Sequence, residues 1–433
     1  MSPKRPRAAR RWLVAGGAGV VLAVAAAAIA LYLTSREGDV YNPGVEFRTE
    51  APPPAAPPPS PRRPQTEAFA WPFYGYTKDR RAYLPVSTDL RPPYARLWSV
   101  HAGVLLEFTP VLGGRSIYIL DNKGVLRAIA RRRGRVRWTR RLGKLAASAP
   151  AYAHGRVFVT LLKGRRGRGG RIVALRAKDG RIMWSRSLAS RSESSPLVDH
   201  GRVYFGSENG TVYALRASDG AERWRFRARG PVKAALALSE GRLYFGDYAG
   251  RVYALRRADG HVVWQKATHG ADLGLRAGQF YATAAVAYGR VYVGNTDGFV
   301  YSYDADRGKL AWRKKTTNYV YSSAAVAQVA GGRPTVYVGS YDGNLYALDA
   351  RSGHVRWRYR DGGSISGGVV VVGDIVYFSN VKHRTTTGLG ARTGRRVFRF
   401  GHGAFNPVVS DGRMLFLTGT TTLYGLRPRR QER

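Results

Sequence analysis

The residues best suited to chemistry in this chain are arginines, and one short glycine-rich segment, 163–171, concentrates them. Its cations are Lys163, Arg165, Arg166, Arg168 and Arg171. A guanidinium group presents a fork of N–H donors that matches the oxygens of a phosphate or a carboxylate. The chain as a whole has a formal net charge of +43. The segment is therefore a candidate polyanion-binding site, and the alternative is a solvated, arginine-rich surface.

A second segment, 268–281, interrupts an otherwise regular pattern and contains several polar side chains of different chemistry. Loops carried by a rigid scaffold are where binding residues concentrate. We select four of its residues as candidate ligand contacts, and the alternative is an ordinary surface loop. They are His269, Asp272, Arg276 and Tyr281.

Other kinds of site find little support in the composition. The chain has no cysteine, which excludes disulfides, thiolate metal sites and cysteine nucleophiles. The eight histidines are scattered without metal-ligand spacing, and many acids stand in Asp-Gly pairs typical of turns. Calcium needs about six oxygen ligands, several of them anionic. We expect no catalytic residue, no metal site and no bound cofactor.

The N-terminal residues predict a membrane anchor. Residues 1–11 form a basic tail, and residues 12–35 contain no charged side chain. A helix of about 20 apolar residues spans a bilayer, and a basic flank stays on the cytoplasmic side. We expect a single-pass membrane protein with the rest of the chain outside the cytoplasm. The alternative is a cleaved signal peptide with its cleavage site at Ala28-Ile29-Ala30.

Residues 36–67 have the composition of a linker. They include the run Ala51-Pro52-Pro53-Pro54-Ala55-Ala56-Pro57-Pro58-Pro59-Ser60-Pro61. Such a run favours an extended, solvated polyproline helix that cannot join a sheet. We predict a stalk that holds one domain, residues 68–433, away from the membrane.

Within that domain, an aromatic residue recurs with a mean interval of about 43 residues, the period of a β-propeller blade. The recurring residues are Trp98, Trp138, Trp184, Trp224, Trp264, Trp312, Trp357 and Phe398. Each unit contains short alternating runs of β-branched and aromatic residues separated by Gly turns. We expect these aromatic residues to pack between blades and not to form a cofactor site.

Counting the units predicts an all-β, eight-bladed propeller with four-stranded blades. Seven units are complete, residues 407–427 supply three more strands, and the strand at Trp98 has no unit before it. The N-terminal strand then completes the last blade and leaves no open sheet edge. A seven-bladed ring would require discarding one of the two fragments.

The turn before each tryptophan carries a family resemblance. The spacing Ala-x-x-Gly-x-x-x-Trp occurs at Ala177/Gly180/Trp184 and again at Ala217, Ala305 and Ala350. It resembles the tryptophan-docking motif of the quinoprotein-like propellers built from pyrroloquinoline quinone (PQQ) repeats. Arg131 and Arg257 replace the Ala in two units, and we expect looser blade interfaces there.

The opening stretch Trp71-Pro72-Phe73-Tyr74-Gly75 resembles the same superfamily, whose fold implies a funnel around the axis. Serines that precede the innermost strands are expected at its rim. They are Ser148, Ser194, Ser195, Ser322, Ser323, Ser364 and Ser366.

The resemblance implies two different functions. One is a PQQ-dependent dehydrogenase, in which PQQ and calcium would be the cofactors. The other is a non-catalytic scaffold, similar to the propeller lipoproteins of the outer-membrane β-barrel assembly machinery. We favour a scaffold that binds a protein or another ligand, with an anionic envelope polymer as the alternative. We do not expect nucleic acid as a partner, because the domain is placed outside the cell.

Overall fold

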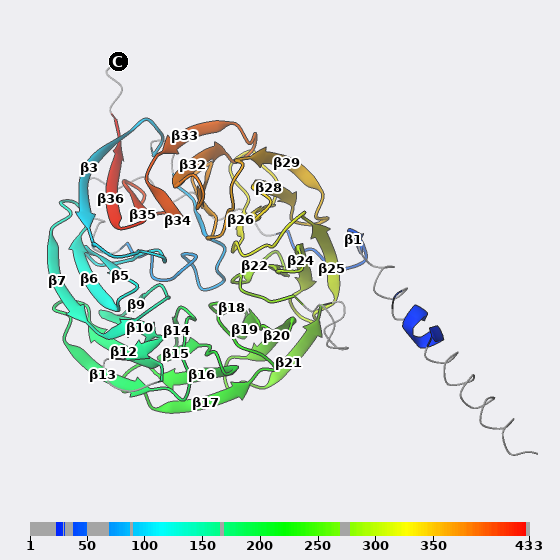
Figure 1. The fold of residues 1–433 in the computed structure, drawn as a ribbon, viewed down its shortest axis with the longest axis horizontal. Coiled ribbons are helices and arrows are strands. Elements are labelled where there is room, and N and C mark those ends of the chain that lie inside the picture. Colours follow the sequence, from blue (N-terminus) through cyan, green and yellow to red (C-terminus); the bar gives the residue numbers. More distant parts are fainter. Residues whose placement is uncertain are drawn as a thin grey trace, which may run out of the picture.

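The computed structural model of the chain describes residues 23–28, 30, 38–49, 69–86, 90–164, 169–268 and 278–429. Eight four-stranded antiparallel sheets surround a central axis, which confirms the eight-bladed propeller (Figure 1). Within each blade the strands run in chain order from the axis outward. In blade 8 the N-terminal strand is outermost.

The first four blades follow one another along the chain, with a small two-stranded sheet of β8 (Gly143–Leu145) and β11 (Lys163–Gly164) beside them. Their strands are β4 (Val111–Gly113), β5 (Ser116–Leu120), β6 (Val125–Ala130) and β7 (Val136–Arg141) in blade 1; β9 (Ala151–Ala153), β10 (Arg156–Leu161), β12 (Arg171–Arg176) and β13 (Ile182–Ser187) in blade 2; β14 (Leu197–Asp199), β15 (Arg202–Phe205), β16 (Thr211–Arg216) and β17 (Glu222–Arg227) in blade 3; β18 (Ala237–Ser239), β19 (Arg242–Gly246), β20 (Arg251–Arg256) and β21 (Val262–Ala267) in blade 4.

Two of the remaining blades gain a fifth strand from the N-terminal region: β1 (Val40–Tyr41) joins blade 5, and β2 (Tyr83–Leu84) joins blade 7. The strands are β22 (Ala285–Ala287), β23 (Arg290–Gly294), β24 (Phe299–Asp304) and β25 (Leu310–Lys315) in blade 5; β26 (Ala325–Ala327), β27 (Thr335–Gly339), β28 (Asn344–Asp349) and β29 (Val355–Arg360) in blade 6; β30 (Val370–Val372), β31 (Ile375–Asn380), β32 (Thr385–Gly390) and β33 (Arg396–Phe400) in blade 7; β34 (Gly403–Ser410), β35 (Leu415–Gly419), β36 (Thr422–Pro428) and β3 (Tyr94–His101) in blade 8.

The burial of each strand follows its residue pattern. The third strand of blade 3, β16, is apolar along most of its length and is buried at every residue but the last. The outermost strand, β17, alternates between half-buried and exposed residues, with Trp224 and Phe226 directed inward. Strands that are covered on both faces read as apolar runs, whereas strands with one wet face alternate.

Blade 8 closes the ring. The N-terminal strand β3 pairs antiparallel with β36 from Tyr94↔Pro428 to His101↔Thr422. The pairing joins the two ends of the propeller through main-chain hydrogen bonds (Figure 1). It also removes the open sheet edge that an unclosed ring would expose.

The tryptophans of the outermost strands lie at the blade boundaries. The indole Nε1 of Trp138 donates a hydrogen bond to the carbonyl oxygen of Ala177 in the next blade, at 3.0 Å. A Cβ atom added to the following Gly180 would lie 2.7 Å from the same indole ring. Glycine is therefore required there by close approach, in addition to its positive φ of 70°.

The two units with arginine in place of alanine keep this interblade hydrogen bond. Trp98 donates to the carbonyl oxygen of Arg131 at 2.9 Å, and Trp224 donates to that of Arg257 at 3.1 Å. The acceptor is a main-chain atom, so the side chain at that position does not decide the bond. The expected loosening is not visible in these distances. Phe398, which has no N–H to donate, packs edge-on against Tyr94 of blade 8 at 5.2 Å.

Residues 69–86, which we call the plug segment, cross the centre of the ring (Figure 1). Trp71 exchanges main-chain hydrogen bonds with Leu112 of blade 1, and Tyr152 of blade 2 donates to Pro72. Four carbonyls then each serve a different blade: Lys78 accepts from Leu238, Asp79 from Val286, Arg81 from Val326 and Ala82 from Val371. The plug segment thus occupies the inner edges of successive blades.

Residues 38–49, which we call the strap, lie against blade 5. The strand β1 pairs antiparallel with β25, with Val40 opposite Arg313 and Tyr41 opposite Trp312. Val45 is buried, and Phe47 stacks on Tyr288 at 5.4 Å. These residues fall in the predicted linker 36–67, and they contact the propeller.

The predicted membrane span lies mostly outside the described residues. Of residues 12–35, the structure describes 23–28 and Ala30, and all of these are helical. Among the residues that the structure describes, no helix combines the length and the apolar character needed to cross a membrane. The whole proline-rich run, residues 51–61, is likewise outside them.

Candidate functional site: a tyrosine-lined funnel on the axis

Chain order gathers two sets of loops on one face of the ring. The turns between the second and third strands of the blades and the loops that lead into the innermost strands lie there, and we call it the funnel face. A cavity of about 240 Å³ opens on it at the axis. The plug segment forms its floor, with Tyr74 at the bottom.

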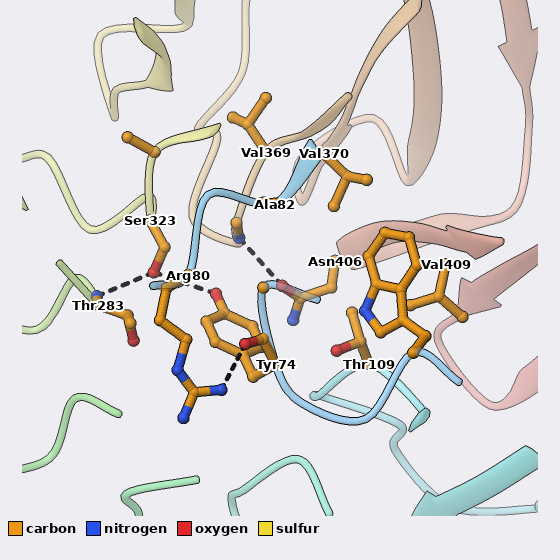
Figure 2. A pocket seen from close by; sticks show the side chains of 14 residues that line it. Tyr74, Arg80, Ala82, Thr109, Thr283, Ser323, Val369, Val370, Asn406 and Val409 are labelled. Carbon is orange, nitrogen blue, oxygen red and sulfur yellow. Dashed lines mark hydrogen bonds between the residues drawn. The ribbon is translucent and has the colours of Figure 1, made fainter. Parts of the chain in front are cut away.

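Hydrogen bonds fix the floor (Figure 2). The Tyr74 hydroxyl donates to Ser323 Oγ at 3.1 Å, and Ser323 Oγ accepts from the amide of Thr283 at 2.9 Å. Beside them, Asn406 Oδ1 accepts from the amide of Gly368 at 3.0 Å. Only about 10 Å³ remains in the pocket around Tyr74 and Arg80, which is no more than one water molecule needs. The floor is therefore closed.

Arg80 ties the floor to the surrounding blades (Figure 2). Its fully buried guanidinium donates to the carbonyl oxygens of Tyr74, Leu236 and Pro196. Burial lowers the pKa of Arg80 to about 9, with opposing contributions from Tyr74 and Asp79. The side chain stays cationic at neutral pH, and the three carbonyls supply the polar surroundings that a buried charge requires.

Five tyrosines form an arc around one side of the funnel mouth, on loops of blades 4, 5 and 6. Successive ring centroids lie 6.3 Å apart for Tyr248 and Tyr281, 5.5 Å for Tyr281 and Tyr321, and 4.9 Å for Tyr321 and Tyr341. Tyr319 completes the arc 5.9 Å from Tyr321, and its side chain is half exposed. We call these five residues the tyrosine arc.

An ion-paired cluster faces the arc. Lys233 Nζ lies 2.9 Å from Glu193 Oε1 and 3.3 Å from Glu208 Oε1. The same ammonium lies 5.4 Å from the ring centre of Tyr248. Burial is the main cause that raises the pKa of Glu193, and Lys233 opposes it. A third acid, Glu107, accepts from Asn122 Nδ2 at 2.9 Å.

These side chains do not fit a calcium-bound PQQ. The carboxylates of Glu193 and Glu208 hold the Lys233 ammonium between them, whereas a hard dication needs several free oxygen ligands. In the described part of the chain, no three His, Asp or Glu side chains converge on one point. We therefore derive no chemical step through either group.

The structure describes two of the eight binding residues expected from sequence. Tyr281 belongs to the tyrosine arc and lines the funnel. Arg171 begins β12 in blade 2. The other six lie outside the described residues: Arg165, Arg166, Arg168, His269, Asp272 and Arg276. Both interrupted loops join elements at the funnel face, since one leads from β10 to β12 and the other from β21 to β22.

Of the seven serines expected at the funnel rim, Ser364 is half-buried and is not among the residues that line the cavity, and the other six divide into two groups. Ser195, Ser323 and Ser366 line the cavity. Ser148, Ser194 and Ser322 are buried, and the first two donate to the main-chain carbonyls of Thr160 and Ala234.

Sequence reasoning missed most of the tyrosine arc, although a signal was present. Tyr248 and Tyr341 occupy equivalent positions in the turns Asp247-Tyr248-Ala249-Gly250 and Tyr341-Asp342-Gly343. Tyr281 and Tyr321 stand at the same distance before an Ala-Ala-Val strand. An alignment of the repeats on their turns, and not on their tryptophans, would have shown these four residues as two pairs of equivalent positions.

Comparison with known proteins agrees with the fold. The BamB structure from Moraxella catarrhalis superposes with a TM-score of 0.62 at 18% identity, covering 77% of this chain and 99% of that one. The quinohemoprotein alcohol dehydrogenase ADHIIG from Pseudomonas putida HK5 superposes with a TM-score of 0.68 at 15% identity, covering 85% of this chain and 81% of that one. A europium-containing methanol dehydrogenase superposes with a TM-score of 0.68 at 13% identity, covering 83% of this chain and 98% of that one. At such identities the likeness shows the fold alone.

A family match goes further than these superpositions. No curated protein sequence matches the chain. The sequence profile of one family, described as outer membrane protein assembly factor BamB, matches residues 92–190, 168–279 and 276–433. These ranges cover well over half of the chain and every blade. The chain therefore belongs to the BamB family of PQQ-repeat propellers.

Proposed function

We propose that this protein is a non-catalytic scaffold, anchored in the membrane by residues 12–35, whose funnel face binds a segment of a partner protein outside the cytoplasm. The tyrosine arc is the observation that carries the proposal. The family's description as an assembly factor for outer membrane proteins supports a role in binding other proteins.

Tyrosine suits such a surface for physical reasons. Its ring offers a large apolar contact area at a small cost in side-chain entropy, while its hydroxyl can still donate a hydrogen bond. Aromatic residues are enriched at the energetic centres of protein interfaces. The closed floor limits any guest to the outer part of the funnel, which favours a loop or an extended segment over a threaded chain.

Site-specific photo-crosslinking in cells tests the proposal. A photoreactive side chain at Tyr321 should capture a discrete protein, and the same group at the exposed Val355, on the outer strand of blade 6, should not. Replacing Tyr281 with Ala should lower the yield at position 321, because the two rings are in contact. Equal yields at positions 321 and 355 would contradict the proposal.

Polyanion binding is a second candidate, favoured by the charge of blade 1. Residues 111–141 contain ten Lys or Arg residues and one acid, Asp121. Arg137 and Arg141 are exposed on its outermost strand. Binding of polyphosphate should weaken steeply with salt, and charge reversal at Arg165, Arg166 and Arg168 should weaken it further. Affinity that does not change with salt would exclude this candidate.

A further inference from the structure

The first half of the strap is fixed to the outer edge of blade 5. At its start, the carbonyl oxygen of Gly38 accepts from Arg313, and Asp39 pairs with Lys314 and with the amide of Lys315. Asn42 then donates through its amide to Ala311 and through its side chain to Leu310. These bonds add to the strand pairing of β1 with β25.

The second half of the strap runs across the face of blade 5 opposite the funnel face and reaches blade 4. The guanidinium of Arg290, almost fully buried, donates to the carbonyl oxygens of Val45 and Glu46. Arg48 forms ion pairs with Glu240 of the first turn of blade 4 and with Asp306 of blade 5. A segment held by apolar burial, strand pairing and ion pairs is part of the folded domain.

The strap also lies very close in sequence to the predicted membrane span. That span ends at residue 35, and the first strap residue to contact the propeller is Gly38. Three residues of extended chain reach at most about 11 Å. The proline-rich run comes later, at residues 51–61, between the strap and the plug segment. It therefore connects two docked segments and cannot set the distance between membrane and propeller.

We propose that the strap holds the outer edge of blade 5 against the bilayer surface, so that the propeller stands on its rim with the funnel opening sideways. This inference rests on the proposed membrane anchor. The partner of this rim is the layer of anionic lipid headgroups. Exposed cations at the rim, Lys266, Arg307, Lys309 and Lys315, have the sign that such a surface attracts.

The absence of native cysteine allows a direct test with single labelled sites. Lys315→Cys places a fluorophore at the end of β25 in blade 5, and Arg141→Cys places it at the end of β7 in blade 1, four blades away. The two positions are matched, since each residue pairs with the first residue of the neighbouring strand and each substitution removes one exposed cation. The full-length chain is reconstituted into vesicles that contain a headgroup-quencher lipid.

We expect quenching at position 315 to exceed quenching at position 141 several-fold. Releasing the strap with Asn42→Pro and Arg48→Ala should reduce that ratio toward one. Equal quenching at the two sites with the strap intact, in protein that floats with the vesicles, would overturn the inference and leave the anchor standing. Failure to float would overturn the anchor, and the inference would fall with it.

Discussion

The indole Nε1 of Trp312 donates a hydrogen bond to the carbonyl oxygen of Ala350 at 3.0 Å, across the boundary between blades 5 and 6. The indole ring is fully buried, and a Cβ atom added to Gly353 would lie only 2.7 Å from it. The same tryptophan-to-carbonyl bond recurs at every blade boundary except that between blades 7 and 8, where Phe398 takes the place of the tryptophan.

Trp312→Ala should lower the free energy of unfolding by about 3–5 kcal/mol, because it leaves a cavity between two blades and removes one of the two hydrogen bonds that the carbonyl oxygen of Ala350 accepts. Denaturant unfolding followed by circular dichroism measures the change. Val355→Ala, at an exposed position of the next outer strand, is the control and should change stability by less than about 0.5 kcal/mol. Comparable losses for the two variants would show that the blade boundary is not where the tryptophan acts.

Asp297 should make the free energy of unfolding fall as the pH rises, which is the opposite of the usual effect of an ion-paired carboxylate. Burial raises its pKa to about 6, although Tyr301 and the amide of Phe299 donate hydrogen bonds to the carboxylate. Between about pH 4 and 6 the folded state then keeps a proton that the unfolded state has released, so this group's contribution to stability falls as the pH rises.

Asp297→Asn should therefore stabilise the protein above pH 6, by on the order of 2 kcal/mol, and should have little effect below pH 4. Thermal unfolding of both proteins across this range measures the difference. A difference that stays constant with pH would mean that Asp297 does not titrate in this window.

Arg80→Met should weaken the attachment of the plug segment to the loops at Pro196 and Leu236. Three main-chain carbonyls would lose their donor, and we expect a loss of about 2–4 kcal/mol in the free energy of unfolding. The same change at the exposed Arg223 in β17 controls for the loss of one charge. Faster amide hydrogen exchange at Leu238 and Val286, whose amides bond the plug segment, would locate the effect.

Calorimetric titration with PQQ and calcium should give no saturable heat, because Lys233 occupies the place between the funnel's paired acids. Micromolar binding that disappears without calcium would contradict the non-catalytic proposal. The same titration of the Lys233→Ala variant tests this reason directly, since the substitution frees the carboxylates of Glu193 and Glu208 for a cation.

The blades were predictable because their signals are local and repeated: each turn glycine and each tryptophan stands at a fixed place within its own unit. The tyrosine arc was harder to predict, since Tyr248 and Tyr321 both reach Tyr281 only when blades 4, 5 and 6 pack side by side. The strap was assigned to a linker because residues 38–49 belong to no repeat. Their contacts, such as Asn42 with Ala311, join residues that are far apart in sequence.

The plug segment also limits how this architecture can change in evolution. The carbonyls of Lys78, Asp79, Arg81 and Ala82 accept from blades 4, 5, 6 and 7 in order, so the segment is matched to the order of these four blades. Repeat proteins with open ends can gain or lose units by duplication or deletion. In this closed ring, deletion of any one of blades 4 to 7 would leave one of these carbonyls without its donor, and insertion of a blade among them would put donors and carbonyls out of register. A change in the number of these blades would need a compensating insertion or deletion near residue 80.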